Sequence, residues 1–403
     1  MRTHWLVLVL AALTVLGAAV VAAAGEAPSV EVHGWSLTRY YVNTTVDATL
    51  DSQGRITSEE DDSFLAEERI SLSGIARLAD GKQVYAEFYV HPWLPQSDPS
   101  YLYLESLYVD LPTSDGAKVR IGKGRNVAFG IVPAYGNRKT SNYSPLAETF
   151  TMDRVIGVQY LKKLGTNDFA FALQGSQRVG SRYIGMAADG QIDRGTPPAG
   201  TLGTTTVKHL TARDNTADHS GKLEATARYG WSLGDLSLGV SGRVGALDAT
   251  DTAALAKTFG AQYVTDSTRS AYGVDATYRR MPFYGTVEYY DGSTGGVDVD
   301  GFAILIGVEP TPKCTGIWRE MSGACKGLFV RYVDLNVDVV PTLSSATWDV
   351  EQIAVSYVLP LKCKSLPFFK WLQFEYERNK ESVPAGADEI SNDVFFVELF
   401  TAF

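Results

Sequence analysis

Hydrophobic and polar residues alternate along most of this chain. In the segment 83–91 the even positions are apolar, and the odd positions carry aromatic or polar side chains. The segments 221–230 and 270–279 alternate in the same way. A period of two is typical of a β-strand with one face buried, so the pattern predicts an all-β protein.

About sixteen strands are expected from this alternation. They lie near residues 30–42, 64–78, 83–91, 102–111, 118–125, 153–161, 168–176, 221–230, 235–246, 270–279, 283–290, 301–308, 327–337, 348–359, 368–377 and 393–403.

The connections between these strands are alternately short and long. Tight links such as ADGK, PTSDGA, KLGTN, WSLGD and RMP are separated by the stretches 43–63, 92–101, 126–152, 177–219 and 247–269. A soluble sandwich would also alternate, but short turns at one rim and long loops at the other are typical of bacterial outer-membrane barrels. We therefore expect a transmembrane antiparallel β-barrel of about sixteen strands, with periplasmic turns and a water-filled lumen.

The beginning of the chain has the pattern of an export signal. Basic residues precede an apolar run from Trp5 to Val21, and Ala22 to Ala24 follow it. We expect a cleaved signal peptide at 1–24 and a single barrel domain at 25–403, the alternative being an uncleaved anchor helix.

The last segment, NDVFFVELFTAF, has one mostly apolar face that includes Val397, Leu399 and Phe403. We expect this face to contact lipid in the strand that closes the barrel, and the segment to be the signal read by the barrel assembly machinery. The alternative is an edge strand of a soluble sandwich.

Composition narrows the class further. The mean hydropathy is −0.06 and aromatic residues make up 11% of the chain. A helical membrane protein would be far more hydrophobic, whereas a membrane barrel exposes only alternate residues to lipid. The net charge of −10 argues against a nucleic-acid partner.

The stretch VRIGKGRNVAFGIVPAYGNRKTSNYSPLAETFTMDRVIGVQY (119–160) resembles the phosphate-selective (O/P-like) porins and their relatives. CKGLFVRYVDL (325–335) resembles a later strand of that family more loosely, and the terminal Phe403 also fits. The resemblance implies a trimer of such barrels with an inward-folded third loop, although this chain has only scattered counterparts of the family's arginine ladder. The matching residues are Gly122, Lys123, Gly130, Glu148, Asp153, Arg154, Gly157 and Val158.

Basic residues cluster at the third long connection. Arg138 and Lys139 lie within it, and Arg125 and Arg154 lie at the adjoining strand ends. Because guanidinium groups bind oxyanions, these residues are candidates for a constriction that prefers anions such as phosphate. The alternative is that Arg138 and Lys139 are solvated on an extracellular tip.

Further charges fall on the polar faces of the strands and should face the lumen. The basic candidates are Arg69, Arg77, Arg120, Arg228, Arg243 and Arg279, and the acidic ones include Glu87, Asp110 and Glu288. Such a balance is also typical of a general porin.

Catalytic motifs do not support an enzyme. The sequence contains no H-E-x-x-H or P-loop pattern, and its G-x-S-x-G match, GWSLG at 230–234, lies at an expected tight link between two strands. We therefore expect no enzyme, no cofactor and no metal site. The expected function is passive diffusion of small hydrophilic or anionic solutes by a homotrimer embedded in outer-membrane lipid and lipopolysaccharide. The alternative is a non-transporting barrel, an adhesin or structural protein, that binds partners through long loops such as 177–219.

Cys314 and Cys325 bracket TGIWREMSGA, and Cys363 lies in the next short turn. In an oxidising compartment we expect Cys314 and Cys325 to pair, closing a loop of about ten residues that contributes about 2–3 kcal/mol. Mass spectrometry of unreduced peptides should find this linkage. A bond from either residue to Cys363, or free thiols only, would contradict it.

Overall fold

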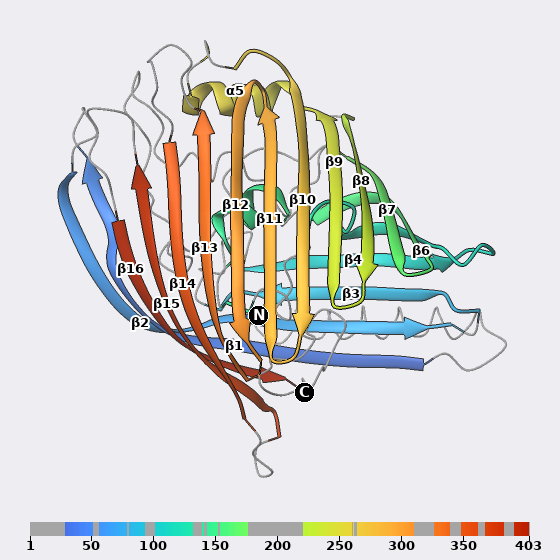
Figure 1. The fold of residues 1–403 in the computed structure, drawn as a ribbon, viewed down its shortest axis with the longest axis horizontal. Helices are drawn as coiled ribbons and strands as arrows, with labels where there is room; N and C mark the ends of the chain where they lie inside the picture. Colours follow the sequence, from blue (N-terminus) through green and yellow to red (C-terminus); the bar gives the residue numbers. More distant parts are fainter. Residues whose placement is uncertain are drawn as a thin grey trace, which may run out of the picture.

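The computed structural model is a closed antiparallel β-barrel of sixteen strands (Figure 1). Each strand pairs with its sequence neighbours, and the last strand pairs with the first. The structure describes residues 29–50, 56–78, 80–92, 101–131, 139–140, 143–151, 154–175, 221–259, 261, 264–309, 326–338, 348–361, 367–382 and 391–402.

The strands are β1 (Ser29–Leu50), β2 (Ile56–Arg77), β3 (Gln83–Val90), β4 (Leu102–Pro112), β5 (Lys118–Arg125), β6 (Arg154–Leu164), β7 (Asn167–Gly175), β8 (Leu223–Leu233), β9 (Leu236–Ala246), β10 (Thr268–Arg280), β11 (Phe283–Thr294), β12 (Val297–Val308), β13 (Gly327–Asp338), β14 (Trp348–Pro360), β15 (Phe369–Ser382) and β16 (Ser391–Ala402).

The expected barrel and its sixteen strands are confirmed, but two expected connections are wrong. β1 continues to Leu50 and β2 begins at Ile56, so most of the expected loop 43–63 is strand. β11 and β12 extend to a tight turn at 295–296, although their expected bounds left 291–300 as a connection. These strand ends carry several polar residues, among them Asp47, Glu59, Asp291 and Asp298, so they resemble loops in sequence although their backbones pair.

The two rims of the barrel differ. Tight turns at 165–166, 234–235 and 281–282 lie at one rim, the short-turn rim. At the other, the long-loop rim, the connections after β5 and β9 each contain a helix, α3 (Pro145–Phe150) and α5 (Ala249–Phe259). In Figure 1, α5 crosses above the ends of β10–β12.

Neither helix was predicted, although their first residues carry capping signals. The Ser144 hydroxyl accepts a hydrogen bond from the Ala147 N–H at 3.0 Å, and Pro145 follows it at the first helical position. The Asp248 carboxylate accepts from the Asp251 N–H at 2.7 Å. Among the described residues, no helix is long and apolar enough to cross a membrane.

Side chains alternate between the two faces of the barrel wall. On β16, Phe395 is 40% exposed, whereas Phe396 and Glu398 are fully buried. On β12, Ile306 is exposed and Leu305 is buried. The outer face is therefore apolar, and its exposed residues include Val240, Val274, Val287, Ile306, Val330, Ile353 and Phe395.

The seam between β1 and β16 closes the barrel through side chains as well as backbone. The Arg39 Nε donates to Glu398 Oε2 at 2.7 Å, and these directly opposite residues are both almost completely buried. One step along the seam, the rings of Trp35 and Phe400 stack at 5.6 Å. Backbone pairing, an ion pair and ring stacking therefore join the two ends of the sheet.

This seam generates a stability prediction. Glu398→Ala removes the carboxylate beside the buried Arg39 guanidinium, which should lower the free energy of unfolding by about 3 kcal/mol. Urea unfolding of the liposome-reconstituted protein, followed by tryptophan fluorescence, should show the loss. Glu398→Gln keeps an acceptor and should lose less, and Lys380→Ala on the outer face is the control. Unfolding of Glu398→Ala at the wild-type urea concentration would contradict this role.

Candidate functional site

The connection between β5 and β6 folds into the barrel. We call its described residues, 126–131, 139–140 and 143–151, the inward loop. Its first leg follows the inner wall, since the Thr226 hydroxyl on β8 donates to Asn126 at 3.2 Å. Ala128 packs against Ala170 and Ala172 on β7. Small wall side chains therefore leave room for the loop backbone.

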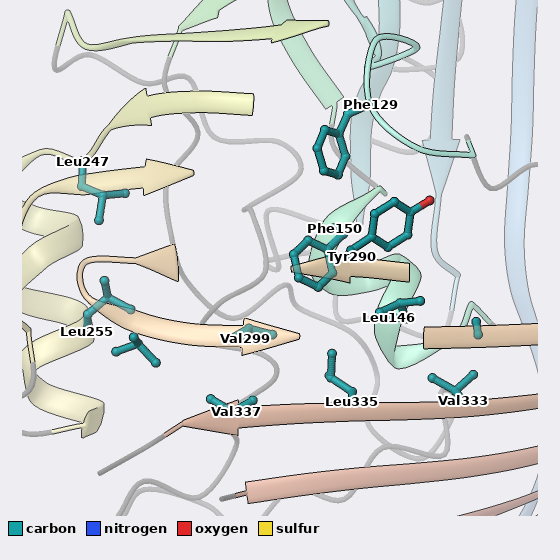
Figure 2. Packing of buried hydrophobic residues seen from close by; sticks show 12 residues of the cluster. Phe129, Leu146, Phe150, Leu247, Leu255, Tyr290, Val299, Val333, Leu335 and Val337 are labelled. Carbon is teal, nitrogen blue, oxygen red and sulfur yellow. The ribbon is translucent and has the colours of Figure 1, made fainter. Parts of the chain in front are cut away.

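Tyr290 on β11 holds the root of the loop. Its hydroxyl accepts from the Ile131 N–H at 3.1 Å and donates to the Glu288 carboxylate at 2.7 Å. Its ring lies 5.6 Å from that of Phe129 and 5.4 Å from that of Phe150, which come from the two legs of the loop (Figure 2).

The tyrosine ring fits because a glycine lies beneath it. A Cβ at Gly273 on β10 would lie 2.1 Å from the Tyr290 ring, which is closer than any real contact. Glycine lets the ring lie flat across the neighbouring strand instead of projecting towards the barrel axis.

Arg243 on β9 holds the same root from a second side. Its Nη2 donates to the Phe150 carbonyl at 2.5 Å, and its guanidinium lies 4.2 Å from the centre of the Phe129 ring. Glu224 lies 4.0 Å from the same guanidinium and 3.6 Å from Arg269. Both legs of the loop are thereby fixed to β9–β11.

An apolar cluster joins the loop to the wall beyond this root. Leu146 of α3 lies above β12 and β13, and Leu255 of α5 packs into the same cluster near the long-loop rim (Figure 2). Its buried members are Phe129, Leu146, Phe150, Leu247, Leu255, Tyr290, Val297, Val299, Ala303, Val333, Leu335 and Val337. Towards the long-loop rim the inner face of β12–β13 is apolar, and the loop covers it.

Lys139 and Thr140 form the loop tip, which lies near the short-turn rim. Lys139 Nζ is 2.6 Å from Glu309 Oε1, just beyond the end of β12. The Arg331 guanidinium on β13 donates to the Thr140 hydroxyl. Burial lowers the pKa of Lys139 from its ordinary value, and the Glu309 carboxylate acts in the opposite direction.

The three described constriction candidates, Arg125, Lys139 and Arg154, lie at two separate places on the barrel wall. Arg125 and Arg154 are cross-strand neighbours on β5 and β6, and Arg154 Nε donates to Glu105 at 2.6 Å. Lys139 lies against β11–β13, on the far side of the barrel in strand order. Arg138 lies outside the described residues. The structure therefore places cations on two opposed walls, each beside a carboxylate.

The candidates for lumen charge all lie at inner-face positions of their strands. Arg120 donates to the Asp110 carboxylate from Nε at 2.8 Å and from Nη2 at 3.2 Å, and the Arg228 guanidinium lies 2.6 Å from Asp275. Arg69 donates to His91 at 3.2 Å. Arg77 pairs with Glu31, and Arg279 lies near the Tyr284 ring. Glu87 accepts hydrogen bonds from Ser71 and Tyr85. The other two candidates, Arg243 and Glu288, are the residues described above at the root of the loop.

The remaining candidates were expected outside the lumen. Val397 and Leu399 lie on the outward face of β16 together with Phe395. Phe403, Cys314 and Cys325 lie outside the described residues.

Sequence reasoning missed several inner-wall charges, among them Arg331, Arg269, Glu105 and Glu309. Arg331 shares the inner face of β13 with Phe329 and Val333. Apolar residues on both faces of β13 hide the polar-in, apolar-out signal. A lone arginine in such a strand was the clue, since a charge on the lipid face would be costly.

The root of the loop generates a test by hydrogen exchange. Tyr290→Phe removes the acceptor of the Ile131 N–H, a loss of about 1 kcal/mol that should speed exchange of this amide about fivefold. Mass spectrometry of the peptide that contains residues 126–131 measures the rate. Tyr289→Phe, a neighbouring tyrosine on the outer face, is the matched control. Equal exchange in the two variants would show that Tyr290 does not hold the loop.

Comparison with known proteins identifies the fold. No family model and no curated protein matches the chain. Among solved structures, the trimer form of the outer membrane protein OmpT of Vibrio cholerae is 12% identical, with 94% of this chain and 100% of that chain covered and a TM-score of 0.56. The anion-selective porin from Comamonas acidovorans is also 12% identical (93% and 100% covered, TM-score 0.55). The outer membrane channel DcaP of Acinetobacter baumannii is 13% identical (93% and 97%, 0.54). The fold is therefore that of sixteen-stranded outer-membrane porins.

Proposed function

We propose that this chain is an outer-membrane porin that lets small hydrophilic solutes diffuse passively. The observation that carries this proposal is a loop folded inside a closed barrel and fixed to its inner wall at the root, at α3 and at the tip. A barrel whose interior is lined with charged and polar groups and narrowed by such a loop is built to restrict passage by size and charge.

The outer face supports a membrane location. Exposed aliphatic residues cover it, and aromatic residues such as Tyr272, Phe283 and Phe395 lie among them. An apolar band with aromatic girdles matches the requirements of a lipid bilayer. We place the short-turn rim in the periplasm and the long-loop rim outside the cell, with export through the signal peptide at 1–24. A homotrimer is supported by the fold shared with the trimer form of OmpT.

The finer proposal is a mild preference for anions. Lys139 at one wall and Arg125 and Arg154 at the other place cations on opposite sides of the lumen. Because Glu309 and Glu105 lie beside them, each cation's field is partly cancelled. Such compensation favours a mild preference over a phosphate-specific site.

Reconstitution tests the pore itself. Liposomes that contain the folded protein should swell in small sugars, because a diffusion channel lets the solute enter with water. Absence of swelling with correctly folded protein would favour the alternative, a non-transporting adhesin or structural barrel. The variant Asn336→Ala, on the outer face, should leave the swelling rate unchanged.

Planar bilayers test the charge preference. In a tenfold potassium chloride gradient the reversal potential should have the sign for anions and lie well below the ~59 mV of ideal selectivity. Arg138→Ala combined with Lys139→Ala should move it towards cations, because it removes loop cations. The control is Arg378→Ala with Lys380→Ala, two exposed residues on the outer face of β15. A cation-selective wild type would contradict the anion preference and leave the porin proposal intact.

A further inference from the structure

The tip of the inward loop is bound at the short-turn rim. Glu309 follows the last residue of β12, and its N–H donates to the carbonyl of Pro282, in the tight turn between β10 and β11, at 2.6 Å. This bond fixes Glu309 at the short-turn rim, so the partner of Lys139 belongs to the rim itself. The loop that leaves the long-loop rim is therefore held at the opposite end of the lumen.

Aromatic rings form a second contact of the tip. Lys139 Nζ lies 5.2 Å from the centre of the Tyr284 ring and 5.6 Å from that of Phe329. These two rings are themselves in edge-to-face contact at 6.3 Å. An ammonium group over aromatic faces is attracted by their quadrupoles, most strongly where water is excluded. The rings and the carboxylate together define one position for this cation.

Arg331 holds the next residue of the tip. Its guanidinium donates to the Thr140 hydroxyl, to Gln352 on β14 at 2.6 Å and to Glu377 on β15 at 3.0 Å. The arginine is thus oriented by two strands before it meets the loop. Adjacent tip residues are therefore bound by different wall residues, Lys139 by Glu309 and Thr140 by Arg331.

The backbone at Lys139 shows that the tip is held in a specific conformation. Its φ is 57°, in the left-handed region that residues other than glycine seldom adopt. Such a conformation persists where surrounding contacts determine it. Here those contacts are the ion pair, the rings and the neighbouring Thr140–Arg331 bond.

We propose that Glu309 is a positioning residue for the channel, and that its pair with Lys139 determines where the cationic loop tip lies and how much of its charge permeating ions encounter. This inference rests on the proposed porin function and adds the residue that adjusts its selectivity. Glu309 does not need to contact the solute. It acts by neutralising Lys139 and by fixing it to the short-turn rim.

Charge-neutral variants test the electrostatic part in planar bilayers. Glu309→Gln leaves the Lys139 charge uncompensated and should raise the anion-to-cation permeability ratio about fourfold. A charge about 10 Å from the permeating ions in water favours the anion about twofold and disfavours the cation about twofold. Lys139→Gln leaves Glu309 uncompensated and should lower the ratio by a similar factor. Glu351→Gln and Lys380→Gln are matched controls, because these cross-strand neighbours lie on the outer face. Both controls should keep the wild-type ratio.

The charge-swapped double variant tests the positioning part. Lys139→Glu with Glu309→Lys restores the ion pair in reverse and should bring both the permeability ratio and the open-channel current noise back towards wild type. The single variants Lys139→Glu and Glu309→Lys should each show increased current noise, because a tip that has lost its partner moves in the current path. If the double variant instead shows the summed effects of the two single changes, the residues act independently and the proposal is overturned.

The outcomes separate this proposal from the function on which it rests. A wild-type protein that folds but conducts no current overturns the porin function. A conducting wild type whose Glu309→Gln and Lys139→Gln variants match the controls in ratio and noise overturns the positioning role alone. A heat-modifiability assay first confirms folding of each variant. If Glu309→Gln does not fold, Lys139→Gln and the double variant still decide the question.

Discussion

Closure of the sheet between β1 and β16 is the constraint on which the rest of the structure depends. An open sheet in a bilayer would expose a row of unpaired N–H and C=O groups, each costing several kcal/mol. Pairing from Trp35 with Ala402 to Asn43 with Val394 removes that edge. The buried Arg39–Glu398 pair then fixes the register, because a slip by one residue would turn one of the two charges towards the outer face and leave the other without its partner.

Closure also creates an inner wall that must accept a loop without being filled by its own side chains. Long side chains of the wall leave this space open because they lie flat across neighbouring strands. Arg228 reaches Asp275 across Gly239, where a Cβ would lie only 2.2 Å from the guanidinium. Tyr290 lies across Gly273 in the same way. Glycines on the inner face thus place the ion pairs and anchoring rings against the wall and leave the space above them to the loop.

The inward loop divides the wall into two chemical regions. Along β12–β13 the inner face is mostly apolar and is covered by Leu146 and Phe150, and charge occurs there at the tip contacts of Lys139 and Arg331. Along β4–β6 the inner face is charged, with Arg154 bound to Glu105. Paired charges at both walls keep the field local, so selectivity depends on the balance within each pair more than on the net charge of the chain.

The sequence by itself determined the strands, the two faces and the alternation of rims, because period-two patterning and turn residues are local properties. It also placed Arg120, Arg228 and Asp110 on the inner face, where the structure has them. It could not determine which charges meet. Glu309 and Lys139 are separated by 170 residues of sequence, and the apolar inner face of β13 concealed Arg331. Only the closed tertiary structure decides these contacts, because the path of a loop across a barrel depends on packing against strands that are distant in sequence.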